Sequence, residues 1–185
     1  MNLAKSLSGN VLEGNTINCL IESLVTEFGR ATDLIVATDD RIYRHDLEAD
    51  RSIGSHFRHN FDFANNWLAG LVTSRIDYTR RKRDPMFEQD RQYALARIRV
   101  LVNSLQDISV EMLDTQVAVR SEVDESVWHR SSAMRELEFI HSHTVHHHAM
   151  VAEKLKAMHV EVPVDLGVAP STLKFWAERD LFING

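Results

Sequence analysis

Apolar residues recur every three or four positions along four stretches of the chain, which is the spacing of one face of an α-helix. These stretches run from Ile17 to Phe28, Ile53 to Leu71, Phe87 to Ile108 and Ala133 to Met158. Seven glycines and three prolines among 185 residues leave few helix breakers. Four long amphipathic helices predict an all-α fold, and a four-helix bundle is the arrangement that buries four such faces together.

Residues at the edges of these stretches indicate where the helices begin. Asn15 or Thr16 is expected to cap the first helix, and Ser52 is expected to cap the second. Pro85 stands just before the third helix, at a position that proline favours. The fourth helix is expected to begin near Ser131.

The remaining segments do not follow a clear helical spacing. Residues 115–124, TQVAVRSEVD, alternate and predict a short β-arm before the last helix. Residues 34–46 are expected to form a partly helical connection. The tail, residues 162–185, is expected to be irregular apart from one short helix at 171–179. No repeat or linker divides the chain, so residues 1–185 are expected to form a single domain.

Composition narrows the classes of function. A net charge of −6 argues against binding to nucleic acid, because such binding rests on positive charge. The single cysteine, Cys19, excludes an intrachain disulfide and cysteine-based zinc sites, and fits a reducing compartment. The chain has no apolar run of membrane-spanning length and no apolar leader at its start. We therefore expect a cytoplasmic protein without a membrane partner.

Histidines are concentrated in the segment HSHTVHHHAM, residues 141–150, which holds five of the ten in the chain. On a helix His143 and His147 lie one turn apart on one face, so both can reach a single metal ion. A third ligand is available from SHFRHNF, where both His56 and His59 are candidates. Three neutral histidines with open coordination positions are typical of a catalytic metal site. The competing interpretation is a solvated histidine-rich helix.

Two further features have weaker functional interpretations. The basic run at 80–83, RRKR, is expected to be a solvated loop between helices. Its alternative role is to hold an anionic substrate, or the carboxylate of a thiol cofactor, near the mouth of the bundle. Asp62 is a candidate hydrogen-bond acceptor for a ligand histidine, although its helical phase directs it away from His59.

Two of these segments resemble motifs of the DinB-like (damage-inducible) superfamily of four-helix-bundle metalloproteins. SIGSHFRH is similar to the family's SIGxxLxH, whose last histidine binds metal and corresponds to His59. HTVHH is similar to the family's HxxHH, whose first and last histidines are ligands and correspond to His143 and His147. The chain departs from the family after these residues, where relatives often read HHxGQ and this sequence reads HHHAM. The resemblance covers nearly the whole chain but does not carry over a particular substrate.

The resemblance implies one divalent ion, often zinc, nickel or iron, and a small-molecule substrate such as a low-molecular-weight thiol. It also implies a homodimer. We therefore predict a metal-dependent thiol transferase or hydrolase, with no residue assigned as general acid or base. The alternative is a non-catalytic helical-bundle module for binding or interaction, in which the metal is structural or absent.

Overall fold

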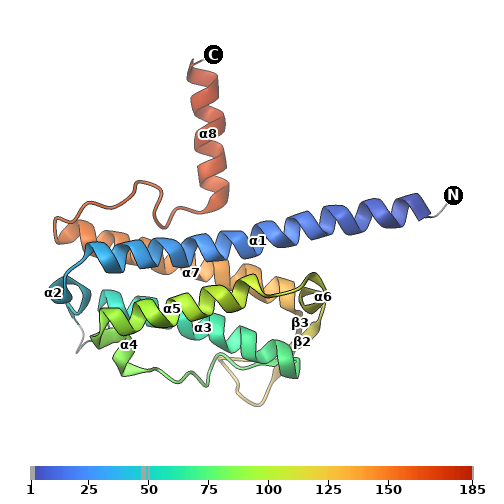
Figure 1. Cartoon of the computed structure of the whole chain (residues 1–185), viewed down its shortest axis with the longest axis horizontal. Coiled ribbons are helices and arrows are strands. Elements are labelled where there is room, and N and C mark those ends of the chain that lie inside the picture. The colour runs from blue at the N-terminus through green and yellow to red at the C-terminus, as the bar shows by residue number, and fades with distance from the viewer. Residues whose placement is uncertain (1–2, 47–48, 50, 185) are drawn as a thin grey trace.

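The chain is predominantly helical, and four long helices run side by side through its body (Figure 1). This computed structural model describes residues 3–46, 49 and 51–184, and side chains only between 19 and 179. The long helices are α1 (Leu3–Ala37), α3 (Ile53–Thr73), α5 (Arg91–Gln106) and α7 (Ala133–Ala157). Between them lie α2 (Asp40–Tyr43), α4 (Pro85–Gln89) and α6 (Val110–Leu113), while α8 (Pro170–Asn184) projects away from the body. The prediction of a mainly α-helical fold is confirmed.

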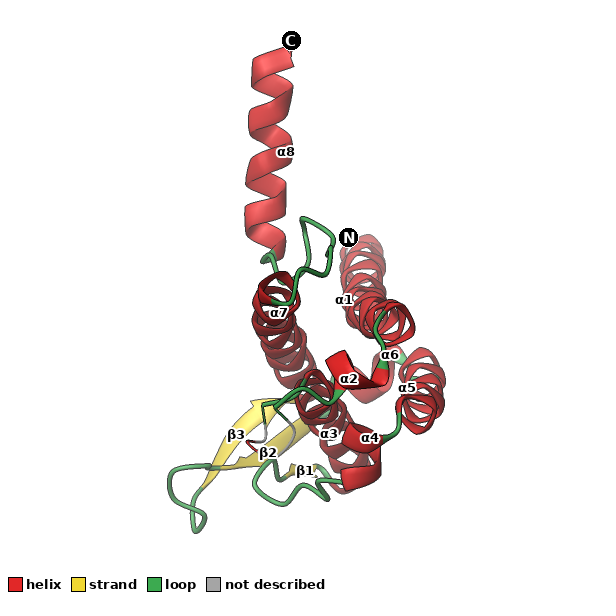
Figure 2. Cartoon of the chain, turned by 90° about the vertical axis from the view of Figure 1, so that its left-hand side faces the viewer, coloured by secondary structure: helices red, strands yellow, loops and turns green. Residues whose placement is uncertain are grey.

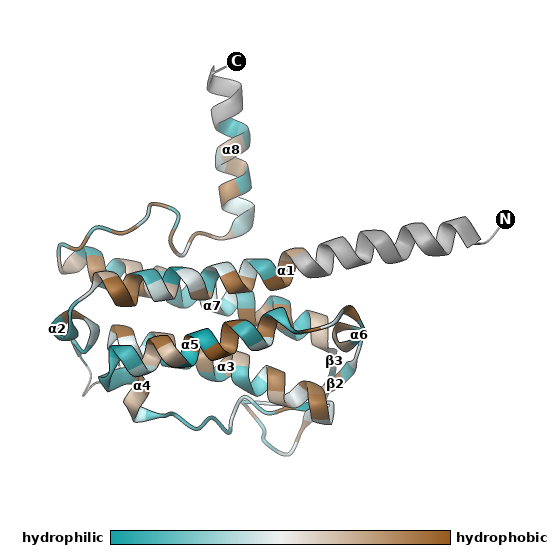
Figure 3. Ribbon diagram, viewed as in Figure 1, coloured by the Kyte–Doolittle hydropathy of each residue, from teal (hydrophilic) through white to brown (hydrophobic). Residues whose placement is uncertain are grey.

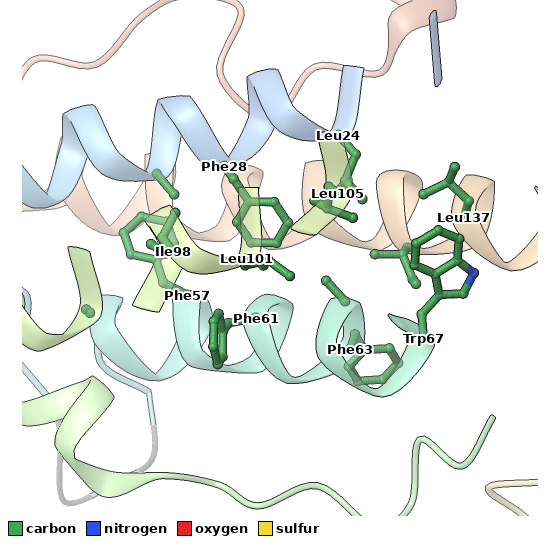
Figure 4. Packing of buried hydrophobic residues seen from close by; sticks show 14 of the residues in the cluster. Leu24, Phe28, Phe57, Phe61, Phe63, Trp67, Ile98, Leu101, Leu105 and Leu137 are labelled. Carbon is green, nitrogen blue, oxygen red and sulfur yellow. The ribbon is translucent and has the colours of Figure 1, made fainter. Parts of the chain in front are cut away.

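The hydrophobic core lies between the four long helices. Helix α1 packs against α5 and α7, and α3 packs against the same two helices. Brown, apolar segments alternate with teal ones along these ribbons, as amphipathic helices require (Figure 3). Figure 4 shows the side chains that meet in this core, among them Leu24 and Phe28 of α1, Phe57 and Trp67 of α3, Leu101 of α5 and Leu137 of α7.

A small sheet joins the ends of α3 and α7. Strand β2 (Gln116–Arg120) pairs antiparallel with β3 (Trp128–Ser132) and parallel with the short β1 (Arg75–Ile76). Figure 2 shows this sheet beside α3 and α7. The expected β-arm is therefore present, although its second strand and β1 were not predicted. Because β1 follows α3 and β3 leads directly into α7, the sheet fixes one end of each helix.

Helix α3 begins where the sequence predicts. The Ser52 side chain accepts a hydrogen bond from the backbone N–H of Ser55 and thereby caps the helix. At the other end the chain turns sharply at Ser74, whose φ of 54° is left-handed. The turn brings Ile76 so close to Gly70 that a Cβ there would lie 2.5 Å from the isoleucine side chain. Glycine is therefore required at this position.

Several predicted helix boundaries were wrong. Helix α1 begins at Leu3, so Asn15 and Thr16 lie inside it and do not cap it. The chain has no proline before Asn15 that would prevent the helix from starting this early. The predicted third helix is divided at Asp90, whose carboxylate accepts the N–H groups of Gln92 and Tyr93 and starts α5 afresh. The tail is more helical than expected, because α8 spans 15 residues. In the described part of the chain, no helix combines the length and apolarity needed to cross a membrane.

Candidate metal centre

Three histidines from two helices meet at the surface where α3 packs against α7. His59 comes from α3, and His143 and His147 come from consecutive turns of α7. One nitrogen of each ring lies within 4.8 Å of those of the other two, and the Nε2 atoms of His59 and His143 are 2.9 Å apart. A tetrahedral ion with metal–nitrogen distances of about 2.1 Å separates its ligand atoms by about 3.4 Å. The described cluster therefore has the size and donor set of a metal site.

His56, the alternative third histidine, occupies a different position. It is buried one turn before His59, and its Nδ1 lies 2.9 Å from the Nδ1 of His147. This contact leaves the Nε2 of His147 available on the other side of its ring. A ligand histidine commonly uses its second nitrogen in this way, to bond a group that fixes the ring orientation. The arrangement thus favours His59 as a ligand and His56 as the residue that orients His147.

The local electrostatics keep all three rings neutral. Burial and the neighbouring Arg81 lower the pKa of His59 to about 3. Burial, with the positive charge that His146 and Arg81 can carry, lowers the pKa of His143 to about 4. Burial and the adjacent His59 lower the pKa of His147 to about 2. Since only a neutral imidazole has a lone pair for a cation, the neutral state of the three rings suits a metal site at neutral pH.

Aromatic side chains form one wall of the cluster. The ring of His143 lies 4.5 Å from that of Phe63 and 5.6 Å from that of Phe139, measured between centroids. Phe63 in turn stacks on Tyr78. Tyr78 and Phe139 also line a cavity of about 420 Å³ beside the sheet. A small molecule in this cavity would contact Phe139, which also packs against His143.

The loop between β1 and α4 places Arg81 against His59. Its Nη1 lies 2.8 Å from the Nδ1 of His59, and its guanidinium carbon lies 5.0 Å from the centre of the Phe63 ring. Arg80 and Lys82, its neighbours in the basic run, are exposed. The prediction of a solvated loop therefore holds for those two residues but is wrong for Arg81.

Asp62 does not contact the cluster. Its carboxylate accepts a hydrogen bond from Arg58, 3.1 Å away, and Arg58 also pairs with Glu88. All three groups lie at the junction of α3 and α4. The structure thus gives Asp62 a role in this ion-pair network, and it is His56 that contacts His147, one of the three candidate ligands.

No family model matches the chain, and no solved structure matches it. Over 110 residues it is 31% identical to FK506-binding protein 5 of Rhizopus delemar. That match covers 57% of this chain and 29% of the relative, so the chain corresponds to less than a third of that protein's length.

His148, another histidine of the segment 141–150, contacts α1 and not the candidate metal centre. His148 is completely buried, and its Nδ1 lies 2.7 Å from a carboxylate oxygen of Glu27 on α1. Glu27 lies 3.8 Å from Arg30, which also pairs with Asp165 in the segment after α7. Helical spacing singles out His143 and His147 in this segment and gives His148 no role, yet His148 is fully buried. This burial depends on α1, which packs against the face of α7 that carries His148, and the periodicity of α7 alone cannot reveal it.

This pair allows a prediction about stability and pH. Burial alone would raise the pKa of Glu27, but the hydrogen bond and charge of His148, together with Arg30, lower it below 4.5. The ionised carboxylate therefore stabilises the fold above pH 4.5, and this contribution is lost as the pH falls through the folded-state pKa. We expect Glu27→Gln to lower the free energy of unfolding by about 2 kcal/mol at pH 7, the usual scale for a hydrogen bond to a charged group.

Urea denaturation at pH 7 and at pH 4 measures this effect. Glu22→Gln, at an exposed position of the same helix, is the matched control, and it should change the free energy of unfolding little at either pH. The difference in free energy of unfolding between wild type and Glu27→Gln should be smaller at pH 4 than at pH 7. An equal difference at the two pH values would contradict the proposed ionisation of Glu27.

Proposed function

We propose that this chain binds one divalent metal ion through His59, His143 and His147, and that it is a four-helix bundle of the DinB-like superfamily. One observation carries the proposal: the three histidines that the sequence motifs single out have ring nitrogens within 4.8 Å of one another. His59 and His143 are separated by 84 positions in the chain, so their approach reflects the fold rather than local sequence. The packing of α1 and α3 against both α5 and α7 supports the bundle.

The donor set fits a catalytic ion of the zinc, nickel or iron class. When bound, such an ion polarises water or lowers the pKa of a coordinated thiol, which makes a nucleophile near neutral pH. The chain supplies three neutral rings, and His56 holds the His147 ring through its Nδ1. Three protein ligands leave a coordination position for a small-molecule substrate, such as a low-molecular-weight thiol. We therefore propose thiol transfer or hydrolysis as the reaction class.

Helix α8 supports a second candidate, a module that binds another protein chain. It projects from the body (Figure 1), and Phe175 on it is 61% exposed. Val164, in the segment before α8, is 91% exposed. Large apolar side chains at a projecting helix are suited to contact with a partner, such as a second copy of the chain. In that case the histidine cluster would be structural or would hold no metal.

Elemental analysis of the tag-free protein after incubation with zinc, nickel or iron tests the first candidate. We expect about one ion per chain in wild type and loss of that ion in His143→Ala. His146→Ala is the matched control, because His146 is exposed on the same helix one turn from His143, and it should keep the ion. A wild-type protein that takes up none of the three metals would refute the metal centre and leave the interaction module as the better candidate.

A further inference from the structure

Among the described side chains, no carboxylate forms a close ion pair with Arg81. Its hydrogen bonds within the described part of the chain go only to the ring of His59, and its Nε is buried without a partner. The negative charges of Asp62 and Glu122 attract the Arg81 guanidinium from a longer distance, but Asp62 is hydrogen-bonded to Arg58 and Glu122 is exposed. A half-buried guanidinium with donors to spare is a site for an anion.

The contact between Arg81 and His59 is incompatible with metal binding by His59. Arg81 donates to the Nδ1 of His59, so the single hydrogen of this neutral ring must be on Nε2. Binding an ion through Nε2 moves that hydrogen to Nδ1, where it would face the N–H of Arg81. Binding through Nδ1 would displace Arg81 directly. In either case the guanidinium loses its acceptor while a divalent charge is placed beside it.

We propose that Arg81 is the substrate-recognising side chain of this site and that it binds the carboxylate of a small substrate next to the metal ion. This inference rests on the proposed function. A carboxylate would accept hydrogen bonds from the N–H groups of Arg81 that no longer reach His59, and its negative charge would offset that of the ion. Arg81 has a planar fork of donors that matches a carboxylate in two parallel hydrogen bonds, and Phe63 packs against its face.

The charges around Arg81 favour a carboxylate over a phosphate group. The buried Arg58 already pairs with Asp62 and Glu88. Lys82 and Arg83 are exposed, and Arg83 acts on Arg81 through its charge, but among the described hydrogen bonds of the loop only those of Arg81 reach the histidine cluster. A single guanidinium at the cluster suits a group with a single negative charge, whereas phosphate sites commonly gather several donors and cations. The specificity therefore rests on one side chain that can be replaced without altering a metal ligand.

Titration of the cobalt-loaded protein with acetate, followed by isothermal titration calorimetry, tests this assignment. Cobalt occupies sites of the zinc type, and calorimetry registers acetate at Arg81 whether or not the carboxylate also coordinates the ion. We expect Arg81→Gln to retain about one cobalt per chain but to bind acetate at least about tenfold more weakly than wild type. Lys82→Gln, the exposed neighbour, is the matched control and should bind acetate as wild type does.

The outcomes separate this inference from the proposed function. A wild-type protein without cobalt would overturn the metal centre first, and this inference with it. Normal cobalt content with equal acetate affinity in wild type and Arg81→Gln would overturn only the role of Arg81. A second titration with inorganic phosphate tests the class of anion. Phosphate binding that depends on Arg81, with acetate binding that does not, would overturn the carboxylate assignment.

Discussion

Replacing His59 with alanine is expected to lower the affinity for zinc on the order of a thousandfold, because it removes one of three ligands. Replacing His56 should have a smaller effect, about ten- to a hundredfold, the usual result of losing a group that orients a ligand. The two residues lie one turn apart on α3, and both are near His147, but only His59 belongs to the group of three converging nitrogens. The comparison therefore separates a ligand from its supporting residue.

Competition with a chromophoric zinc chelator measures both affinities in one assay. His146→Ala again provides the control for loss of an imidazole from an exposed position on α7. A larger loss in His56→Ala than in His59→Ala would reverse the assignment and make His56 the third ligand. Equal losses would mean that both rings contact the ion.

The second large effect concerns stability. Trp67 is fully buried on α3, and its Nε1 donates a 3.0 Å hydrogen bond to the carbonyl of Ala133, the first residue of α7. It thus fills the core and joins the two helices that carry the histidines. Because Trp67→Ala leaves a large cavity and removes the hydrogen bond between the two helices, we expect it to lower the free energy of unfolding by about 3–5 kcal/mol.

Urea denaturation followed by circular dichroism gives this value. Val72→Ala is the matched control on the same helix, since Val72 is 82% exposed, and it should change stability by less than about 0.5 kcal/mol. If Trp67→Ala were as stable as this control, the junction between α3 and α7 would not depend on the indole.

The sequence predicts α3 and the histidine cluster well because their signals are local or repeated. Ser52 combines a capping side chain with a following apolar stripe, and both features specify a helix start. His143 and His147 are spaced by one helical turn, so their shared face follows from the geometry of a single helix. Within the described side chains, the fold then adds His59 to the same place.

Other features depend on contacts between distant segments, and the sequence does not predict them. The apolar spacing of α7 cannot show that α1 covers the face carrying His148, so the buried pair with Glu27 was missed. The basic loop gives no sign that one of its arginines turns inward, because that depends on the path from β1 to α4. The start of α1 was misplaced because good capping residues also occur inside helices.

The separation of the histidines along the chain also sets when the cluster can form during synthesis. His59 precedes His143 by 84 residues, which takes on the order of 5–15 s to translate. Until α7 leaves the ribosome, α3 lacks the helix that covers much of its apolar face, including Trp67. A nascent chain that ends before residue 133 therefore leaves this face without its covering helix, and the cluster can form only after His147 has been synthesised.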